Sequence, residues 1–233
     1  MAEHVFGLEA AAADDPQAAA IARNRAALYR WFARLFLTSP DETAVIDLRN
    51  GGMRAVLESL AMTPGAEEPV EAICRALDQG SAASVAAELA VDRFRLFDGI
   101  GGDRTTPPYR SAFTSDGGLL CQEATAEMER VLRQYGLKLD ATLREPADHL
   151  SLQLEVVAQL ALRAAGAAAA GSAALPFLAA QAEFIDRQLL DWVPRFAARL
   201  ATVDEPGFHA GLAAVLVLVL EQDRAYLAEL IDT

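Results

Sequence analysis

The feature that most constrains the fold of this chain is the spacing of its apolar residues, which recurs at intervals of three and four. One broad apolar face, at i, i+3, i+4, i+7 and i+8, is formed by Leu28, Trp31, Phe32, Leu35 and Phe36. Similar stripes recur along most of the 233 residues, whereas the apolar–polar alternation typical of β-strands is scarce. The spacing therefore predicts an all-α fold.

Glycine, proline and capping residues divide the periodic segments into about nine to eleven helices. Asp15 is expected to cap the first helix, and Ser39-Pro40 to end it, because the residue before a proline avoids helical backbone. A long loop is expected near 98–118, where prolines, hydroxyl groups and glycines gather. We expect the whole of 1–233 to form a single domain that resembles a helical bundle.

The segment 41–80 is interrupted by an Asn-Gly-Gly run, a Pro-Gly pair and a final glycine. These breaks predict several short helices. Ser81 is a good cap for the helix that follows. In that helix Ala90, Phe94 and Phe97 fall at i, i+4 and i+7, so we expect all three to face the core.

Prolines and small residues predict the layout of the second half. Pro146 is expected to open a helix as its first residue, and Pro194 to kink a later one by removing a backbone hydrogen bond. A last, nearly apolar helix is expected over about 207–230. Two stretches, 136–146 and 164–174, are alternative positions for a hinge.

Charge and composition exclude several classes of protein. The net charge is −13, which disfavours binding to phosphate groups and favours cationic partners. The longest apolar run, 212–220, is too short to cross a bilayer, and the first 20 residues lack the positive segment of a secretory leader. Two cysteines with no CxxC pair predict a reduced protein. We therefore expect a cytoplasmic protein that binds neither nucleic acid nor membrane.

Motifs for catalysis and for cofactor binding are absent from the sequence. GxxxxGK[ST], HExxH and GxSxG do not occur, and the three histidines do not share a helix face. The inventory predicts no catalytic residues, no metal site and no cofactor, so we do not expect an enzyme.

Two polar clusters remain to be explained, and the first is TPPYRSAFTSDGGLL at 106–120. Pro107 and Pro108 stiffen the backbone, so Tyr109 can be held outward beside hydroxyl groups such as that of Ser111. A rigid tyrosine of this kind suits a peptide-binding surface. Alternatively, the segment is an ordered crossover loop that Tyr109 pins to the core.

The second cluster is EPADHLSLQLE at 145–155. With Pro146 opening a helix, Asp148 would lie in the first turn, where the helix dipole stabilises a carboxylate. Glu155, seven residues further on, would share its face, and His149 lies beside it. The alternative is purely structural, with Asp148 as a capping residue and His149 as a hydrogen-bonded core histidine.

Taken in order, these motifs resemble the TorD/DmsD family of cytoplasmic molybdoenzyme maturation chaperones. The resemblance rests on an aromatic helix that ends in Leu96-Phe97, a glycine-rich break, PPY-x-S at 107–111, EP-x-DHL at 145–150 and WVPRF at 192–196. It covers most of the chain. No single motif is specific, but their order and separation in a helical chain are typical of the family.

The resemblance implies binding rather than catalysis. Family members hold the twin-arginine signal peptide, and often the apo-subunit, of a molybdopterin oxidoreductase until the cofactor is inserted, which prevents premature export. The positions implied for peptide binding are Leu96, Phe97, Pro107, Pro108, Tyr109, Ser111, Asp148 and His149, to which the face shared with Asp148 adds Glu155. The family also implies a monomer or a domain-swapped dimer.

The resemblance also implies how these positions would bind the peptide. Leu96 and Phe97 would wall an apolar groove, and Tyr109 would give a flat contact. Asp148 and Glu155 would receive arginine guanidinium groups through charge-assisted hydrogen bonds. The sequence departs from the family pattern at four positions, which concern the identity of the client: Arg110, Ala112, Gln153 and Gln188.

Two other functions are weighed against this one. An all-α transcription regulator of TetR-like size would use the arginines of the first helix, which are Arg23, Arg25, Arg30 and Arg34. However, 41–60 lacks the basic recognition helix that such a regulator needs. An α-helical hydrolase or isomerase would use Asp148 and His149 as an acid–base pair, yet it lacks an evident nucleophile or metal.

Overall fold

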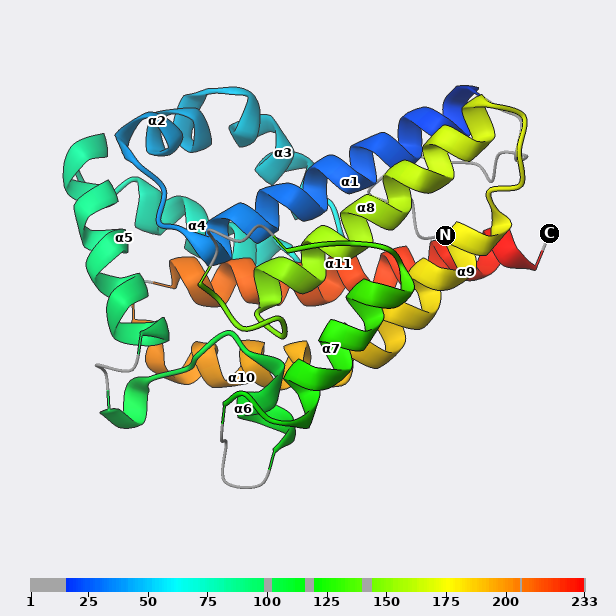
Figure 1. Cartoon of the computed structure of the whole chain (residues 1–233). Helices are drawn as coiled ribbons and strands as arrows, with labels where there is room; N and C mark the ends of the chain where they lie inside the picture. Colours follow the sequence, from blue (N-terminus) through cyan, green and yellow to red (C-terminus); the bar gives the residue numbers. More distant parts are fainter. Residues whose placement is uncertain (1–15, 99–101, 116–119, 140–143, 206, 233) are drawn as a thin grey trace. The chain divides into compact units, whose positions relative to one another are not determined.

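A computed structural model describes residues 16–98, 102–115, 120–139, 144–205 and 207–232, and within these ranges the chain is helical with no β-strand (Figure 1). The prediction of an all-α fold with nine to eleven helices is confirmed. The helices are α1 (Pro16–Leu37), α2 (Glu42–Asn50), α3 (Gly52–Ala61), α4 (Glu67–Leu77), α5 (Ala82–Phe97), α6 (Arg110–Thr114), α7 (Glu123–Gln134), α8 (Leu150–Ala169), α9 (Leu175–Phe184), α10 (Val193–Val203) and α11 (Phe208–Ile231).

The contacts of the chain gather in two compact units. Of the described residues, unit 1 holds 37–107 and 193–221, and unit 2 holds 16–36, 108–192 and 222–232. That 1–233 form one domain stays a prediction. The expected cap at Asp15 and part of the proposed hinge, 140–143, lie outside the described residues.

Unit 1 is built from short helices whose boundaries follow the predicted breaks. The carboxylate of Asp41 accepts a hydrogen bond from Ala44 N–H at the start of α2, and the hydroxyl of Ser81 accepts one from Ser84 N–H at the start of α5. Of the long loop predicted near 98–118, residues 110–114 form α6, and 99–101 and 116–119 lie outside the described residues. The fully buried core includes Val45, Leu57, Ile73, Leu77, Leu96, Phe196, Leu200, Phe208 and Leu212.

A glycine allows two helices of unit 1 to approach closely. A Cβ atom at Gly211, in the first turn of α11, would lie 2.6 Å from the carbonyl oxygen of Pro69 in α4 and 2.8 Å from a side-chain carbon of Ile73. Because backbone cannot yield as a flexible side chain can, this contact requires glycine. The last helix begins at Phe208 and ends at Ile231, close to the predicted bounds.

In unit 2, α1 and α8 run antiparallel and side by side (Figure 1). Alanines at one end form a small buried cluster of Ala19, Ala22 and Ala165, and Arg30 pairs with Glu155 towards the other end. Small side chains let the two helix axes approach closely. Low-complexity residues 164–169 therefore belong to a helix, and only the following residues make the turn, in which Gly171 has φ +64.

Two predictions about prolines are wrong. Pro194 does not kink a long helix; a π-helical turn, Ile185–Leu189, follows α9, and Pro194 lies in the first turn of α10. Proline is tolerated there because the first backbone N–H groups of a helix have no partner within it. Pro146 does not open α8, which begins at Leu150 behind the cap residue His149.

The interior of unit 2 holds a charged cluster that the apolar spacing did not predict. The guanidinium of Arg25 (α1) donates to the carboxylate of Asp223 (α11) and, over 2.8 Å, to Oε1 of Gln181, while the hydroxyl of Tyr29 donates to Asp223 over 2.7 Å. Burial lowers the pKa of Arg25, but the adjacent Asp223 outweighs burial and leaves that pKa above its ordinary value. Arg25 is therefore charged and paired inside the protein.

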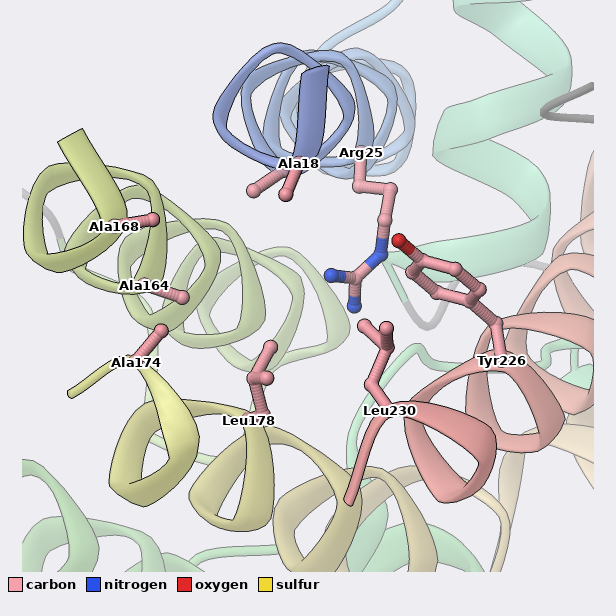
Figure 2. Close-up of a pocket in the computed structure, with 9 residues that line it drawn as sticks. Ala18, Arg25, Ala164, Ala168, Ala174, Leu178, Tyr226 and Leu230 are labelled. Carbon is pink, nitrogen blue, oxygen red and sulfur yellow. The ribbon is translucent and has the colours of Figure 1, made fainter. Parts of the chain in front are cut away.

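Figure 2 shows the guanidinium of Arg25 beside a small pocket, with the ring of Tyr226 close by. The centre of that ring lies 5.5 Å from Arg25 Cζ. The pocket has a volume of about 70 Å³, and its other lining residues are mostly small or aliphatic: Ala18, Ala22, Ala164, Ala168, Ala174, Leu178 and Leu230. That volume suits a few water molecules and is too small for a peptide.

Candidate functional site

The two polar clusters lie side by side in unit 2. The N–H of Leu150 donates to the carbonyl oxygen of Pro108 over 2.8 Å, and the N–H of Arg110 donates to the carbonyl oxygen of Asp148 over 3.1 Å. These bonds make an isolated antiparallel bridge between Tyr109 and His149. Residues about 40 apart in the sequence are thus held together by backbone hydrogen bonds.

Asp148 lies at the centre of this junction, and its side chain is 0% exposed. One carboxylate oxygen accepts a hydrogen bond from Ser111 N–H (2.8 Å), and the other accepts one from the hydroxyl of Thr125 (2.6 Å). Asp148 therefore joins the segment before α8 to α6 and α7. Because Asp148 precedes the helix, the expectation that it lies in the first turn of a helix is wrong, and its carboxylate is occupied by protein donors.

His149 caps α8 and supports Tyr109. Its Nδ1 accepts a hydrogen bond from Ser151 N–H over 3.1 Å, so in the neutral ring the proton is on Nε2. The ring packs edge to face against Tyr109, with 5.0 Å between ring centres. The hydroxyl of Tyr109 donates to the carboxylate of Glu145, and Tyr109 is half-buried. Both rings are thus held in fixed orientations.

Glu155 is separated from this junction. Its carboxylate accepts hydrogen bonds from Arg30, with 3.0 Å between Nη2 and Oε1, and from Gln159 over 2.7 Å. It faces α1, whereas Asp148 faces α6 and α7. The two carboxylates do not share a helix face, because Asp148 lies before the helix begins.

The apolar positions predicted for peptide binding also lie inside the molecule. Leu96 and Phe97 are buried in unit 1, where the ring of Phe97 packs edge to face on His209 at 5.2 Å between centres. Phe94, expected in the core, is instead 51% exposed. The helical spacing put Phe94 and Phe97 on one face of α5, but of these two only Phe97, at the C-terminal end of the helix, is buried.

Beside the junction in unit 2 the surface is hollowed by a pocket of about 530 Å³. Two carboxylates, those of Glu129 and Glu145, lie among its lining residues, which also include Cys121, Gln122, Thr125, Ala126, Leu139, Arg144, Pro146 and Ala147. Thr125 contacts the pocket and also bonds to Asp148, and Glu145 bonds to Tyr109. The hollow, whose charged lining residues are these two glutamates and Arg144 and which we call the acidic hollow, therefore adjoins the motif residues.

Sequence reasoning missed Glu129 and Glu145 as candidate site residues. Glu145 is the first residue of the EP-x-DHL motif, and this place in the motif is the sequence signal that could have identified it. Glu129 lies on the exposed side of α7, and nothing in its local pattern distinguishes it from other exposed glutamates. Only the fold brings these two carboxylates to one hollow.

Two positions where the chain departs from the family pattern contact each other. The guanidinium of Arg110 donates to Oε1 of Gln188 over 3.1 Å, and both side chains bind the carboxylate of Glu127, at 2.6 and 2.8 Å. Arg110 also pairs with Asp191 at 3.1 Å. Burial raises the pKa of Glu127, but the bonds and charge of Arg110 outweigh burial, so that pKa lies below its ordinary value.

Within the described ranges, three or more histidine, cysteine or acidic side chains never come together as a metal site would require. No helix of that part of the chain is long and apolar enough to cross a bilayer. The structure is thus that of a helical protein in which Tyr109, which follows two prolines, is bridged to the buried residues Asp148 and His149. This junction lies beside the acidic hollow.

Comparison with known proteins identifies the family. The family model described as nitrate reductase delta subunit matches residues 60–198. The chain is 31% identical over 208 residues to a chaperone protein TorD of Vibrio parahaemolyticus, covering 87% of this chain and 94% of the relative. It is 34% identical over 213 residues to a chaperone protein TorD of Vibrio cholerae, covering 89% and 94%. The chain belongs to the TorD/DmsD family.

Proposed function

We propose that the chain is a chaperone for the maturation of a molybdenum-cofactor oxidoreductase in the cytoplasm. In this proposal it binds the twin-arginine signal peptide, the apo-subunit or both, assists cofactor insertion and prevents premature export. The relatives that support it are named chaperones, so the chain would act by binding and not as an enzyme. The observation that carries the proposal is the acidic hollow beside the motif junction.

Charge and geometry favour a cationic peptide in that hollow. The net charge of −13 attracts a positively charged leader over a distance. Within the hollow, the carboxylates of Glu129 and Glu145 can accept the planar donors of arginine, and bidentate pairing favours arginine over lysine. Tyr109 is held against Glu145 and fixes its position. We therefore assign the role of arginine acceptor to these two glutamates.

That the nine residues named from the sequence bind the peptide stays a prediction, and their structural setting suggests how each would act. Pro108, Ser111, Asp148 and His149 would hold the wall of the hollow, with Tyr109 at its edge. Contributions from the remaining residues would be indirect: Leu96 and Phe97 through the core of unit 1, Pro107 through the backbone, and Glu155 through its pair with Arg30.

A regulator of TetR-like size is not favoured. Arg25, in the first helix, is buried and paired with Asp223. Arg30 of the same helix is paired with Glu155. Two of the four arginines that would meet nucleic acid are thus engaged within unit 2. A gel-shift with genomic DNA is expected to show no retardation.

Isothermal titration calorimetry tests the proposed function directly. The wild-type protein is mixed with leaders of the molybdoenzymes encoded in its own genome, and with the same leaders carrying two lysines in place of two arginines. We expect binding to at least one leader and about tenfold weaker binding of its lysine form, equivalent to about 1.4 kcal/mol. Absence of binding to every leader and to the apo-subunits would contradict the proposal.

A further inference from the structure

An exposed apolar stripe runs along α5 in unit 1. It consists of Ala83, Ala87, Ala90, Val91 and Phe94, which fall at i, i+4, i+7, i+8 and i+11 and therefore share one helix face. Val91 is 67% exposed and Phe94 51% exposed. Single exposed apolar residues are ordinary, but a continuous stripe on one helix indicates a surface that meets a partner.

The opposite face of the same helix already supplies the core of unit 1. Val85, Leu89 and Leu96 are buried there, while Phe97 is buried at the C-terminal end of the side that carries the stripe. The stripe is therefore not needed for the fold of the unit, and it remains apolar on the side that the unit leaves exposed. A helix that is apolar on two faces is usually buried on both.

We propose that this stripe on α5 binds the apolar segment of the twin-arginine signal peptide, a proposal that rests on the proposed function. Its length matches such a segment. The stripe covers three helical turns, about 17 Å at 1.5 Å per residue. The apolar segment of a leader has about 7–15 residues, so it spans a similar length when helical. An amphipathic helix laid along another apolar helix face is a common mode of peptide recognition.

Charge near the stripe also suits a leader, whose first segment is positively charged. Between Glu88 and Asp98 the helix and its cap residue hold three acids and two arginines. Both arginines are paired with acids of the same segment, Arg93 with Asp98 at 3.1 Å and Arg95 with Asp92 at 2.9 Å. Three acids against two arginines leave one net negative charge beside the stripe, which favours a cationic partner over an acidic one.

The test uses the full chain and two synthetic labelled leaders. The first has an Arg-Arg pair followed by an apolar segment of about 12 residues, and in the second that segment is replaced by serine and glycine. Binding is measured by fluorescence anisotropy for the wild type, for the double variant Val91→Asp/Phe94→Asp and for the control Met62→Asp. Met62 is 81% exposed, lies outside α5 and therefore controls for a new charge at an apolar surface position.

We expect the double variant to bind the first leader at least tenfold more weakly than the wild type, and Met62→Asp to bind it equally well. Binding of the second leader is expected to be the same in all three proteins. The milder variant Val91→Ser/Phe94→Ser, with an intermediate loss, keeps the test valid if the charged variant does not fold, which thermal melting followed by circular dichroism would reveal.

The possible failures are distinguishable. If the wild type binds neither of these leaders, nor any leader or apo-subunit of the molybdoenzymes encoded in its own genome, the proposed function is contradicted. If it binds a leader of its own genome but not the first synthetic leader, the α5 proposal alone is overturned. If the wild type and the double variant bind the first leader equally, the α5 proposal alone is overturned. If the wild type is a dimer that the double variant converts to a monomer with unchanged affinity for the leader, the stripe is an interface with a second copy of the chain, and the proposal is likewise overturned.

Discussion

Asp148 and Glu145 are carboxylates three residues apart, yet one lies in the interior of unit 2 and the other lines a hollow at its surface. Asp148 is closed off by two donors of its own chain, whereas Glu145 accepts a bond from Tyr109 and still borders open space. A buried charge needs hydrogen-bond or ionic partners, so removing one side of such a contact destabilises the fold. A charge at a hollow can instead meet a ligand. The difference separates a group that holds the site together from a group that is placed to contact a ligand.

The largest effect is expected for the most deeply buried charge. Asp223→Ala removes the partner of Arg25 and leaves that guanidinium buried and unpaired, so we expect a loss of about 3–5 kcal/mol in the free energy of unfolding. Urea denaturation measures it, with the exposed Asp232→Ala as a control that is expected to change stability by less than about 0.5 kcal/mol. A loss below about 1 kcal/mol for Asp223→Ala would contradict the structural role.

Asp148→Ala comes next. It leaves Ser111 N–H and the hydroxyl of Thr125 without their acceptor, and buried unsatisfied groups each cost about 1–3 kcal/mol, so we expect a loss of about 3 kcal/mol. Asp148→Asn keeps one acceptor oxygen and should lose less. Urea denaturation measures both. If Asp148→Ala is as stable as the wild type, the carboxylate does not hold the junction and the contrast with Glu145 disappears.

The pH dependence of stability tests a buried group of unit 1. Burial, with help from Arg93 and Arg95, lowers the pKa of His209 to about 3 from its ordinary value near 6.5. Between these values the unfolded chain binds a proton that the folded protein does not. Stability is therefore lost as the pH falls below 6.5, by about 1.4 kcal/mol per pH unit from this group.

His209→Leu removes that contribution. Between pH 7 and pH 5 the variant is expected to lose about 2 kcal/mol less than the wild type, which urea denaturation at the two pH values measures. Parallel pH dependences of the two proteins would show that His209 is not held neutral in the core.

The smallest effect is expected for the exposed pair of Arg30 and Glu155. A double-mutant cycle with alanine at each position should give a coupling below about 1 kcal/mol that falls further in high salt. A coupling as large as that expected for Arg25 and Asp223 would mean that exposure does not distinguish the two pairs.

The sequence predicted more of the fold than of the site. Helical spacing and chain breaks identified the elements of unit 1, and Ser81 caps α5 as predicted, whereas the cap at Asp41 was not predicted. Local pattern could not show that the side chain of His149, and not Pro146, begins α8. It also placed Phe94 in the core, because two apolar faces of one helix look alike until packing selects one.

The composition of the site depends on contacts between segments far apart in the chain. Tyr109 and His149, which belong to two separate motifs, come together through a backbone bridge. The sequence did not predict that Asp148 would be sealed by Thr125 of another helix, or that Arg25 would be buried against Asp223, since neither partner lies near the other in sequence. A charged side chain can be buried only where it has a partner, and here the partner is distant in the sequence. The local pattern around the charged residue therefore does not predict its burial.

The most direct test of the central claim compares leader binding by Glu129→Gln/Glu145→Gln with that of the wild type, using calorimetry and a leader that the wild type binds. Glu123→Gln, an exposed α7 glutamate that does not line the hollow, is the matched control. We predict at least tenfold weaker binding for the double variant, an unchanged melting temperature and no effect of the control. Equal affinity of the double variant and the wild type would contradict the claim that carboxylates at the hollow receive the arginines of the partner.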